Sequence, residues 1–257
     1  MSRIIAVGHG DRISALPAPP GEIAWNDSDL TRQSDNRIIS SVEEDGWTVF
    51  SSSLTYMVED AGVPFYAPNI AERVYLEGAP AGSGRGMARS VSGEPTILHA
   101  GVLLKVSENF VNDAANLTKI FYLWSAGQSK FILSLTGGQN FNLAFLLRHS
   151  PGNTAYMGAT EVPQSEARCV PGQWHVVEFR VESASEPEMG GSADGRGRVW
   201  LDGVLTHDIG GLDTHFIGQS RHWTSAEWNT IRGGTGPDNP EDMRWWAGAL
   251  MTAVGGS

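Results

Sequence analysis

The sequence predicts an all-β protein, an antiparallel β-sandwich that carries an extended N-terminal arm. Its 257 residues include 31 glycines and 13 prolines, an excess over the usual share that indicates many turns. Short apolar runs rich in β-branched and aromatic residues alternate with these turns, and the periodicity of helices is nearly absent. Several short strands with regular turn signals are typical of sandwiches and barrels, and a chain of this length can form one such domain.

The arm is predicted to span residues 1–45, ahead of a single domain at residues 46–257. Pro17, Pro19 and Pro20 interrupt any regular element in the arm, and polar residues follow them. The apolar run at residues 4–7 could add as a strand to the edge of another sheet. We therefore expect a homo-oligomer or a particle-bound subunit in which residues 1–20 contact another chain.

The predicted strands of the domain are all short. They lie at residues 47–56, 98–106, 119–124, 131–136, 141–148, 174–182, 198–201, 204–207, 228–232 and 243–254. The best helix candidate is a turn or two near residues 111–117.

The segment at residues 174–182 is the clearest strand, because its residues alternate strictly in character. One face comprises His175, Val177, Phe179 and Val181. The other face comprises Trp174, Val176, Glu178, Arg180 and Glu182. This period of two predicts a half-buried antiparallel strand whose apolar face lies in the core.

A hairpin is predicted next, because Asp202 and Gly203 separate two apolar runs. A type I′ turn needs a positive φ at both central positions, so Gly203 should have one. Val199 and Leu201, on the strand before the turn, are predicted to be buried. The polar stretch at residues 183–197 is expected to be an exposed loop.

The charge balance argues against two classes of partner. The chain has 18 lysines and arginines against 29 aspartates and glutamates, a net charge of -11 at pH 7. A binder of nucleic acid or of an anionic membrane would normally show a basic surface. No run is apolar enough for a membrane span or a secretory signal, so we expect a cytoplasmic protein or one that is released by lysis, free or in a virion.

The single cysteine, Cys169, excludes an internal disulfide and is interpreted as a buried, unreactive thiol.

Two strings carry a family resemblance. GQWHVVEFRVE at residues 172–182, followed by GRVWLDGVL at residues 197–205, resembles the concanavalin A-like lectin and glucanase superfamily. The likeness is greatest to the branch that contains laminin G-like domains and jelly-roll polysaccharide lyases, and it covers residues 46–254. The resemblance implies a concanavalin A-like jelly roll, and its motifs specify the sandwich more than an activity.

The resemblance does not carry a calcium site with it. Relatives often end on a strand with aspartates, and the matching strand at residues 245–250 has none. A separate loop is a weak calcium candidate, because calcium takes carboxylate and amide oxygens from such loops. Its ligands would be Asp238, Asn239 and Asp242, and the alternative is a hydrophilic turn. No other cofactor is predicted.

Glycoside hydrolysis is disfavoured by the spacing of the carboxylates. A retaining glycosidase needs two carboxyl groups about 5–5.5 Å apart. The glucanases that the chain resembles carry them in a Glu-x-Asp-x-x-Glu run, which is absent here. Glu178 and Glu182 share a strand face but would lie about 13 Å apart. They are interpreted as solvated charges beside Arg180.

A polysaccharide lyase needs a cation for the uronate, a base for the α-proton and an acid for the leaving oxygen. The chain has neither the Gln-Ile-His or Gln-Val-His motif nor the tyrosine motif of the alginate lyases that it resembles. The residues that could still supply a lyase site are Lys119, Tyr122, Arg148, His149 and Arg180.

The aromatic content favours carbohydrate as a partner. Nine tryptophans are present, and exposed aromatic rings suit the C–H faces of sugars. The predicted glycan-binding residues are Trp200, Arg198, Asp202, Arg244 and Trp246. The favoured function is a non-catalytic glycan-binding or structural surface module, such as a virion decoration or a capsid- or tail-associated protein. The alternative is a polysaccharide lyase that acts on a uronate polymer.

Overall fold

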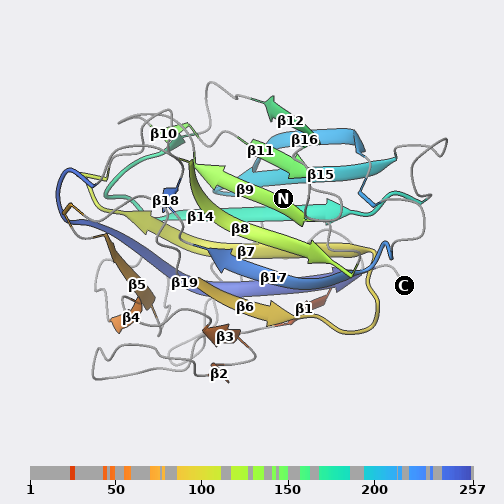
Figure 1. The fold of residues 1–257 in the computed structure, drawn as a ribbon, viewed down its shortest axis with the longest axis horizontal. Helices are drawn as coiled ribbons and strands as arrows, with labels where there is room; N and C mark the ends of the chain where they lie inside the picture. The colour runs from red at the N-terminus through yellow and green to blue at the C-terminus, as the bar shows by residue number, and fades with distance from the viewer. Residues whose placement is uncertain are drawn as a thin grey trace.

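Two antiparallel β-sheets face each other in the computed structural model of the chain (Figure 1). The structure describes residues 24–26, 43–44, 47–49, 55–58, 70–75, 77–78, 86–110, 117–126, 130–135, 141–142, 145–149, 157–162, 168–185, 194–212, 214–215, 220–229, 232–233 and 239–255. The predicted all-β antiparallel sandwich is confirmed. In this described part of the chain no helix has the length and apolar character that a membrane span requires.

The first sheet, sheet A, contains β7 and β19, the two longest strands that the structure describes. Its order is β16 (Val204–Leu212), β15 (Gly195–Leu201), β14 (His175–Glu182), β7 (Ile97–Val106), β19 (Met243–Gly255), β5 (Ile70–Tyr75) and β4 (Thr55–Val58), and β1 (Ala24–Asn26) also pairs with β19. Every strand pair in this sheet is antiparallel.

The second sheet, sheet B, covers one face of sheet A. Its order is β18 (Arg232–Gly233), β8 (Leu117–Ser125), β17 (Trp223–Asn229), β6 (Gly86–Ser90), β3 (Trp47–Val49) and β2 (Glu43–Glu44), and β9 (Lys130–Leu135) pairs with β8. Two further pairs are β10 (Phe141–Asn142) with β13 (Arg168–Cys169), and β11 (Phe145–His149) with β12 (Met157–Val162).

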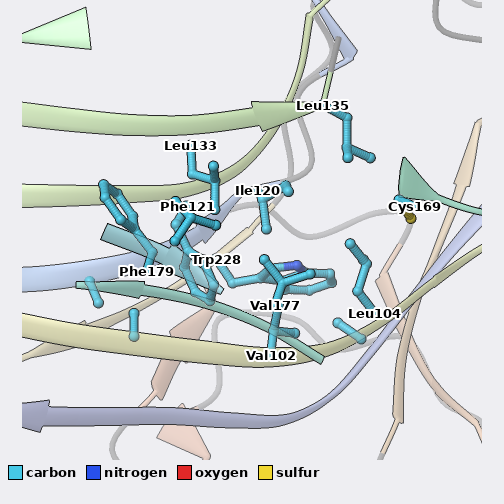
Figure 2. Close-up of a cluster of buried hydrophobic side chains, with 14 of the residues drawn as sticks. Val102, Leu104, Ile120, Phe121, Leu133, Leu135, Cys169, Val177, Phe179 and Trp228 are labelled. Atoms are coloured by element: carbon cyan, nitrogen blue, oxygen red, sulfur yellow. The ribbon is translucent and has the colours of Figure 1, made fainter. Parts of the chain in front are cut away.

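The hydrophobic core lies between the two sheets, as Figure 2 shows. Val177 and Phe179 of β14 face Phe121, Leu133 and Trp228 of sheet B, and all five side chains are buried. The prediction of buried residues on β14 and β15 is therefore confirmed. These residues are Val177, Phe179, Val181, Val199 and Leu201.

The hairpin between β15 and β16 has the predicted turn. Asp202 has a φ of 52° and Gly203 a φ of 77°, as a type I′ turn requires. The Asp202 carboxylate adds two hydrogen bonds, accepting one from the Val176 amide and one from Nδ1 of His175, each at 2.8 Å. The side chain therefore fastens the turn to the neighbouring strand β14.

Several strand boundaries differ from the predictions. Strands β5 and β6 were not predicted, because each has charged or small residues where a clear apolar alternation was expected. The predicted strand at 47–56 is divided between β3 of sheet B and β4 of sheet A. The predicted strand at 141–148 is likewise two segments, β10 and β11, and the predicted strand at 228–232 starts earlier, at Trp223. Residues 111–116 of the predicted helix lie outside the described residues.

Short pieces of the predicted arm belong to the sheets of the same chain. Strand β1 pairs with β19, where Ala24 lies opposite Val254, and β2 pairs with β3. Residues 1–23 lie outside the described residues, so the contact of residues 1–20 with another chain stays a prediction.

Two glycines of the β15–β16 pair should differ in how strongly their replacement by alanine destabilises the fold. A Cβ at Gly195 would collide with the Leu212 carbonyl oxygen and approach Cγ2 of Thr214 to 2.6 Å, whereas a Cβ at Gly210 would meet nothing within 4 Å. We expect Gly195→Ala to lower the free energy of unfolding by about 1–3 kcal/mol, as overpacking does. Gly210→Ala should change it by less than about 0.5 kcal/mol. Urea titrations of the two variants test this, and equal stabilities would contradict it.

Candidate functional site

A polar cluster occupies the face of sheet A that points away from sheet B, called the outer face below. Since alternate residues of β14 enter the core, Glu178, Arg180 and Glu182 lie on the outer face. Directly opposed residues of neighbouring antiparallel strands share a face. The register therefore places beside them Trp200, Arg198 and Arg196 of β15 and Gly101 and His99 of β7.

A buried histidine–carboxylate pair lies at the centre of this cluster. His99 Nε2 is 3.0 Å from Glu178 Oε2, and the two side chains are 1% and 3% exposed. The Trp200 ring stacks on the imidazole, with centroids 5.5 Å apart and planes 12° apart. Among the described residues, Glu178 Oε1 has no hydrogen-bond partner. The interpretation of Glu178 as a solvated charge is wrong, because its side chain is buried against His99.

Three arginines and two carboxylates form an ion-pair network next to that pair. Arg198 Nη1 donates to Glu182 Oε1 at 2.6 Å, and Arg180 Nε lies 3.0 Å from the same oxygen. Arg198 Nε lies 3.4 Å from Asp208 Oδ1, and Arg196 donates to both Asp208 oxygens. The network thus carries a net charge of +1, although the net charge of the whole chain is -11.

The pairing shifts the acid–base properties of its members. The hydrogen bond from Arg196, with the two arginine charges, lowers the pKa of Asp208 below its ordinary value. The same hydrogen bond raises the pKa of Arg196. Burial lowers the pKa of Arg180, and the charge of Glu182 offsets part of this lowering. An arginine nevertheless stays protonated in proteins. The guanidinium of Arg180 is therefore a fixed cation in a partly dry setting, where its attraction to an anion is strengthened.

A second cluster lies on the same face, farther along β7. The Lys105 ammonium lies over two indoles, 5.6 Å from the centroid of Trp174 and 5.0 Å from that of Trp246. This tryptophan–lysine ladder crosses β14, β7 and β19, since Trp246 is opposite Lys105 and Trp174 directly precedes β14.

The predicted lyase residues are not brought together. Lys119 and Tyr122 lie on β8 of sheet B, and because the two residues between them are buried, they point to the outside of that sheet. Arg180 lies on the outer face of sheet A, on the other side of the sandwich. Arg148 and His149 belong to β11, of which only the backbone is described.

The predicted glycan-binding residues divide into three places. Trp200 and Arg198 lie in the central cluster of the outer face. Arg244 and Trp246 lie at the start of β19, on the same face, since Trp245 between them is buried. Asp202 holds the β15–β16 hairpin. No contact tests whether these residues bind a glycan, so that assignment stays a prediction.

Two residues of the predicted calcium loop make hydrogen bonds to the turn after β5. Asp242 Oδ1 accepts a hydrogen bond from the Glu77 amide at 2.8 Å, and the Asn239 carbonyl accepts one from the Gly78 amide at 2.9 Å. These bonds fasten the loop to the turn after β5. Asp238 lies outside the described residues. Within the described part of the chain, no three histidine, cysteine or acidic side chains group closely enough to hold a metal ion.

Sequence reasoning missed the two buried partners, His99 and Glu178. Strand β7 is buried on both faces along most of its length, so its apolar alternation does not show which side His99 occupies. The available signal was a titratable residue within each of two strands that the sequence had already predicted.

The thiol of Cys169 is buried as predicted, and its titration should be visible in stability. Burial, and then the charge of Asp202, raises the pKa of Cys169 to about 12. Since an unfolded thiol has a pKa of about 8.5, the neutral thiol stabilises the fold below that pH, and this stabilisation is lost as pH rises towards the folded value. Between these two pKa values, the free energy of unfolding should fall more steeply with pH in the wild type than in Cys169→Ala. The two slopes should differ by at most about 1.4 kcal/mol per pH unit. Urea titrations at several alkaline pH values measure the difference, and parallel profiles would contradict a buried thiol.

Comparison with known proteins rests on structure alone. No protein-family model and no curated protein matches the sequence. Among solved structures, the alginate lyase Aly36B matches with a TM-score of 0.63 and 16% identity, over 88% of this chain and 95% of that one. The alginate lyase vAL-1 from Chlorella virus matches with a TM-score of 0.58 and 11% identity, over 85% and 100%. The endo-β-1,4-glucuronan lyase from the fungus Trichoderma reesei matches with a TM-score of 0.53 and 11% identity, over 90% and 96%.

The fold is the concanavalin A-like jelly roll of these lyases. The expectation of a non-catalytic glycan-binding or structural module as the leading function is wrong. Several of the structures that match over most of the chain are alginate and glucuronan lyases, which favours the alternative that the sequence left open. The comparisons give no support to a virion, decoration or lectin-like role. At identities this low they establish the fold, and the activity must be argued from the site.

Proposed function

We propose that the protein is a polysaccharide lyase that cleaves a uronate-containing polymer on the outer face of sheet A. The observation that carries the proposal is the arginine network beside a buried histidine–carboxylate pair. The jelly-roll fold, which the chain has in common with several uronate lyases, supports it.

The chemistry of a uronate lyase is a β-elimination. A base removes the proton at C-5 of the uronate, its electrons form the C-4=C-5 double bond, the C-4–O-4 bond breaks, and O-4 leaves with a proton from an acid. The C-5 proton is only weakly acidic while the neighbouring carboxylate keeps its negative charge. Cations that bind this carboxylate stabilise the charge that develops in the transition state.

Arg180 and Arg198 are assigned to that role. They lie directly opposite each other on β14 and β15, and Glu182 connects their guanidinium groups. Planar guanidinium groups bind a carboxylate through paired hydrogen bonds, and they keep their charge at any pH of interest. Because Arg180 is only 11% exposed, a uronate bound there loses much of its water.

His99 is assigned as the base. Its position opposite Arg180 on β7 places it next to the carboxylate-binding groups. Ionised Glu178 can only accept a hydrogen bond, so Nε2 of His99 donates to it and the lone pair lies on Nδ1. The carboxylate then stabilises the imidazolium that proton transfer creates. Because the His99 side chain is only 1% exposed, access of a substrate to Nδ1 requires neighbouring side chains such as Trp200 to move.

A hydrolase fits this face less well. Glycoside hydrolysis needs one carboxyl group that stays protonated and acts as the acid. The two carboxylates of the network are paired with arginines, and the pKa of Asp208 is lowered rather than raised. Glu178 is committed to His99.

An assay on a panel of polymers tests the proposal. The protein is incubated with polymannuronate, polyguluronate, glucuronan and, as an uncharged control, a neutral β-glucan. A lyase gives an unsaturated product on at least one uronate polymer, seen as new ultraviolet absorbance that matches the new reducing ends. New reducing ends without that absorbance would show a hydrolase, and no product from any uronate polymer would also overturn the proposal.

A further inference from the structure

The tryptophan–lysine ladder, Trp174, Lys105 and Trp246, is separate from the arginine network. Lys105 and His99 are six positions apart on β7, which corresponds to about 20 Å. Between them on the outer face lie Leu103 of β7 and Val176 of β14, which are opposite each other and buried. The ladder is therefore a second cluster on this face and not an extension of the first.

The composition of the ladder suits a charged sugar ring. Its three side chains are partly exposed, whereas the residues next to them in sequence, such as Leu104 and Trp245, are buried in the core. Indole faces stack on the C–H faces of sugars and lose little entropy, because the rings are already rigid. A lysine ammonium is a compact cation with three donors, and it can bind a carboxylate from several directions.

The indole nitrogen of Trp174 is a further hydrogen-bond donor in the ladder, although the indole nitrogens of the core residues Trp228 and Trp245 also have no partner among the described residues. Nε1 of Trp174 is screened from solvent and has no hydrogen-bond partner among the described residues. A buried N–H group that makes no bond costs stability, and an acceptor oxygen on a ligand would remove that cost. A sugar hydroxyl or carboxylate beside Lys105 provides such an acceptor.

We infer that the tryptophan–lysine ladder is a uronate-binding subsite, distinct from the residues that carry out the elimination. In this subsite one uronate residue of the polymer stacks on an indole, and its carboxylate pairs with Lys105. Nε1 of Trp174 donates a hydrogen bond to an oxygen of this sugar. The uronate identity of this sugar rests on the proposed function, whereas the preference for an anionic ring rests on Lys105 itself.

Calorimetric titration with a saturated diuronate tests the subsite without relying on turnover. Three variants remove one feature each: Lys105→Met the charge, Trp246→Ala one stacking face, and Trp174→Phe the indole N–H. Trp124→Ala, on the outer side of sheet B, is the matched control. Melting temperatures of all four identify any variant that fails to fold.

We expect Lys105→Met to weaken diuronate binding about tenfold or more, since charge-assisted hydrogen bonds are the strong ones. Diuronate binding by Lys105→Met should also depend much less on salt concentration than binding by the wild type. Trp246→Ala should bind diuronate more weakly than the wild type but keep the salt dependence. Trp174→Phe should weaken binding less, and Trp124→Ala should leave it unchanged. A neutral disaccharide should bind wild type and Lys105→Met alike.

Two results would overturn the inference. One is diuronate binding that stays unchanged in both Lys105→Met and Trp246→Ala. The other is a Lys105→Met enzyme that loses kcat on every uronate substrate with KM unchanged, because Lys105 would then belong to the reacting centre. A wild-type protein that binds diuronate through the ladder yet forms no unsaturated product would refute the lyase proposal alone.

Discussion

Replacing Phe179 with alanine is expected to lower the free energy of unfolding by about 3–5 kcal/mol, the range for a fully buried phenylalanine. Phe179 has no exposed surface and lies in the middle of β14, between the two sheets (Figure 2). The variant loses the transfer free energy of the ring and leaves a cavity. Large side chains on both sheets surround that cavity, and they are held in register by the β14–β7 and β14–β15 pairing, so the core cannot collapse to fill it.

Urea unfolding measures this loss, with Val204→Ala as the control. Val204 lies at the start of β16 and is 65% exposed, so its truncation should cost less than about 0.5 kcal/mol. A domain of this size shifts its melting temperature by about 2–4 °C for each kcal/mol, so the two variants should separate clearly by heat as well. A Phe179→Ala protein as stable as Val204→Ala would show that β14 does not lie between the sheets.

The core of sheet A could be predicted because its sequence signals are local. The alternation along β14 assigns Val177, Phe179 and Val181 to one face without knowledge of any other strand. The Asp202-Gly203 pair similarly defines a turn from two residues. Strands β5 and β6 have no comparable signal, and their place in the sheets depends on pairing with β19 and β17, which are distant in sequence.

The sequence predicted Arg180, Arg198 and Trp200 as site residues, but it could not predict the His99–Glu178 pair, which is a property of register. His99 and Glu178 are 79 residues apart, and they meet only because Arg180 of β14 pairs with His99 of β7. The lyase residues that the sequence predicts have suitable chemical types but no common place in the fold. Lys119 and Tyr122 have suitable chemistry, yet β8 places them on the outside of sheet B. Which sheet a strand joins is decided by long-range pairing, and no local pattern contains that information.

Replacing His99 with alanine should produce the largest effect on activity. General base catalysis contributes a factor of about 10²–10⁴, so kcat on the preferred uronate polymer should fall by about this amount. KM should change little, because Arg180 and Arg198 still hold the carboxylate. His222→Ala is the control, since His222 is 28% exposed and lies in the loop before β17, where its Nδ1 contacts Ser220.

Glu178→Gln separates a catalytic role of His99 from a structural one. Glutamine keeps the size of the side chain and can still accept the hydrogen bond from Nε2, but it cannot stabilise an imidazolium by charge. We therefore expect the melting temperature of Glu178→Gln to stay close to that of the wild type while its kcat falls. If instead His99→Ala keeps its kcat and loses only stability, the pair is a packing element beneath Trp200 and the base must be sought elsewhere on the outer face.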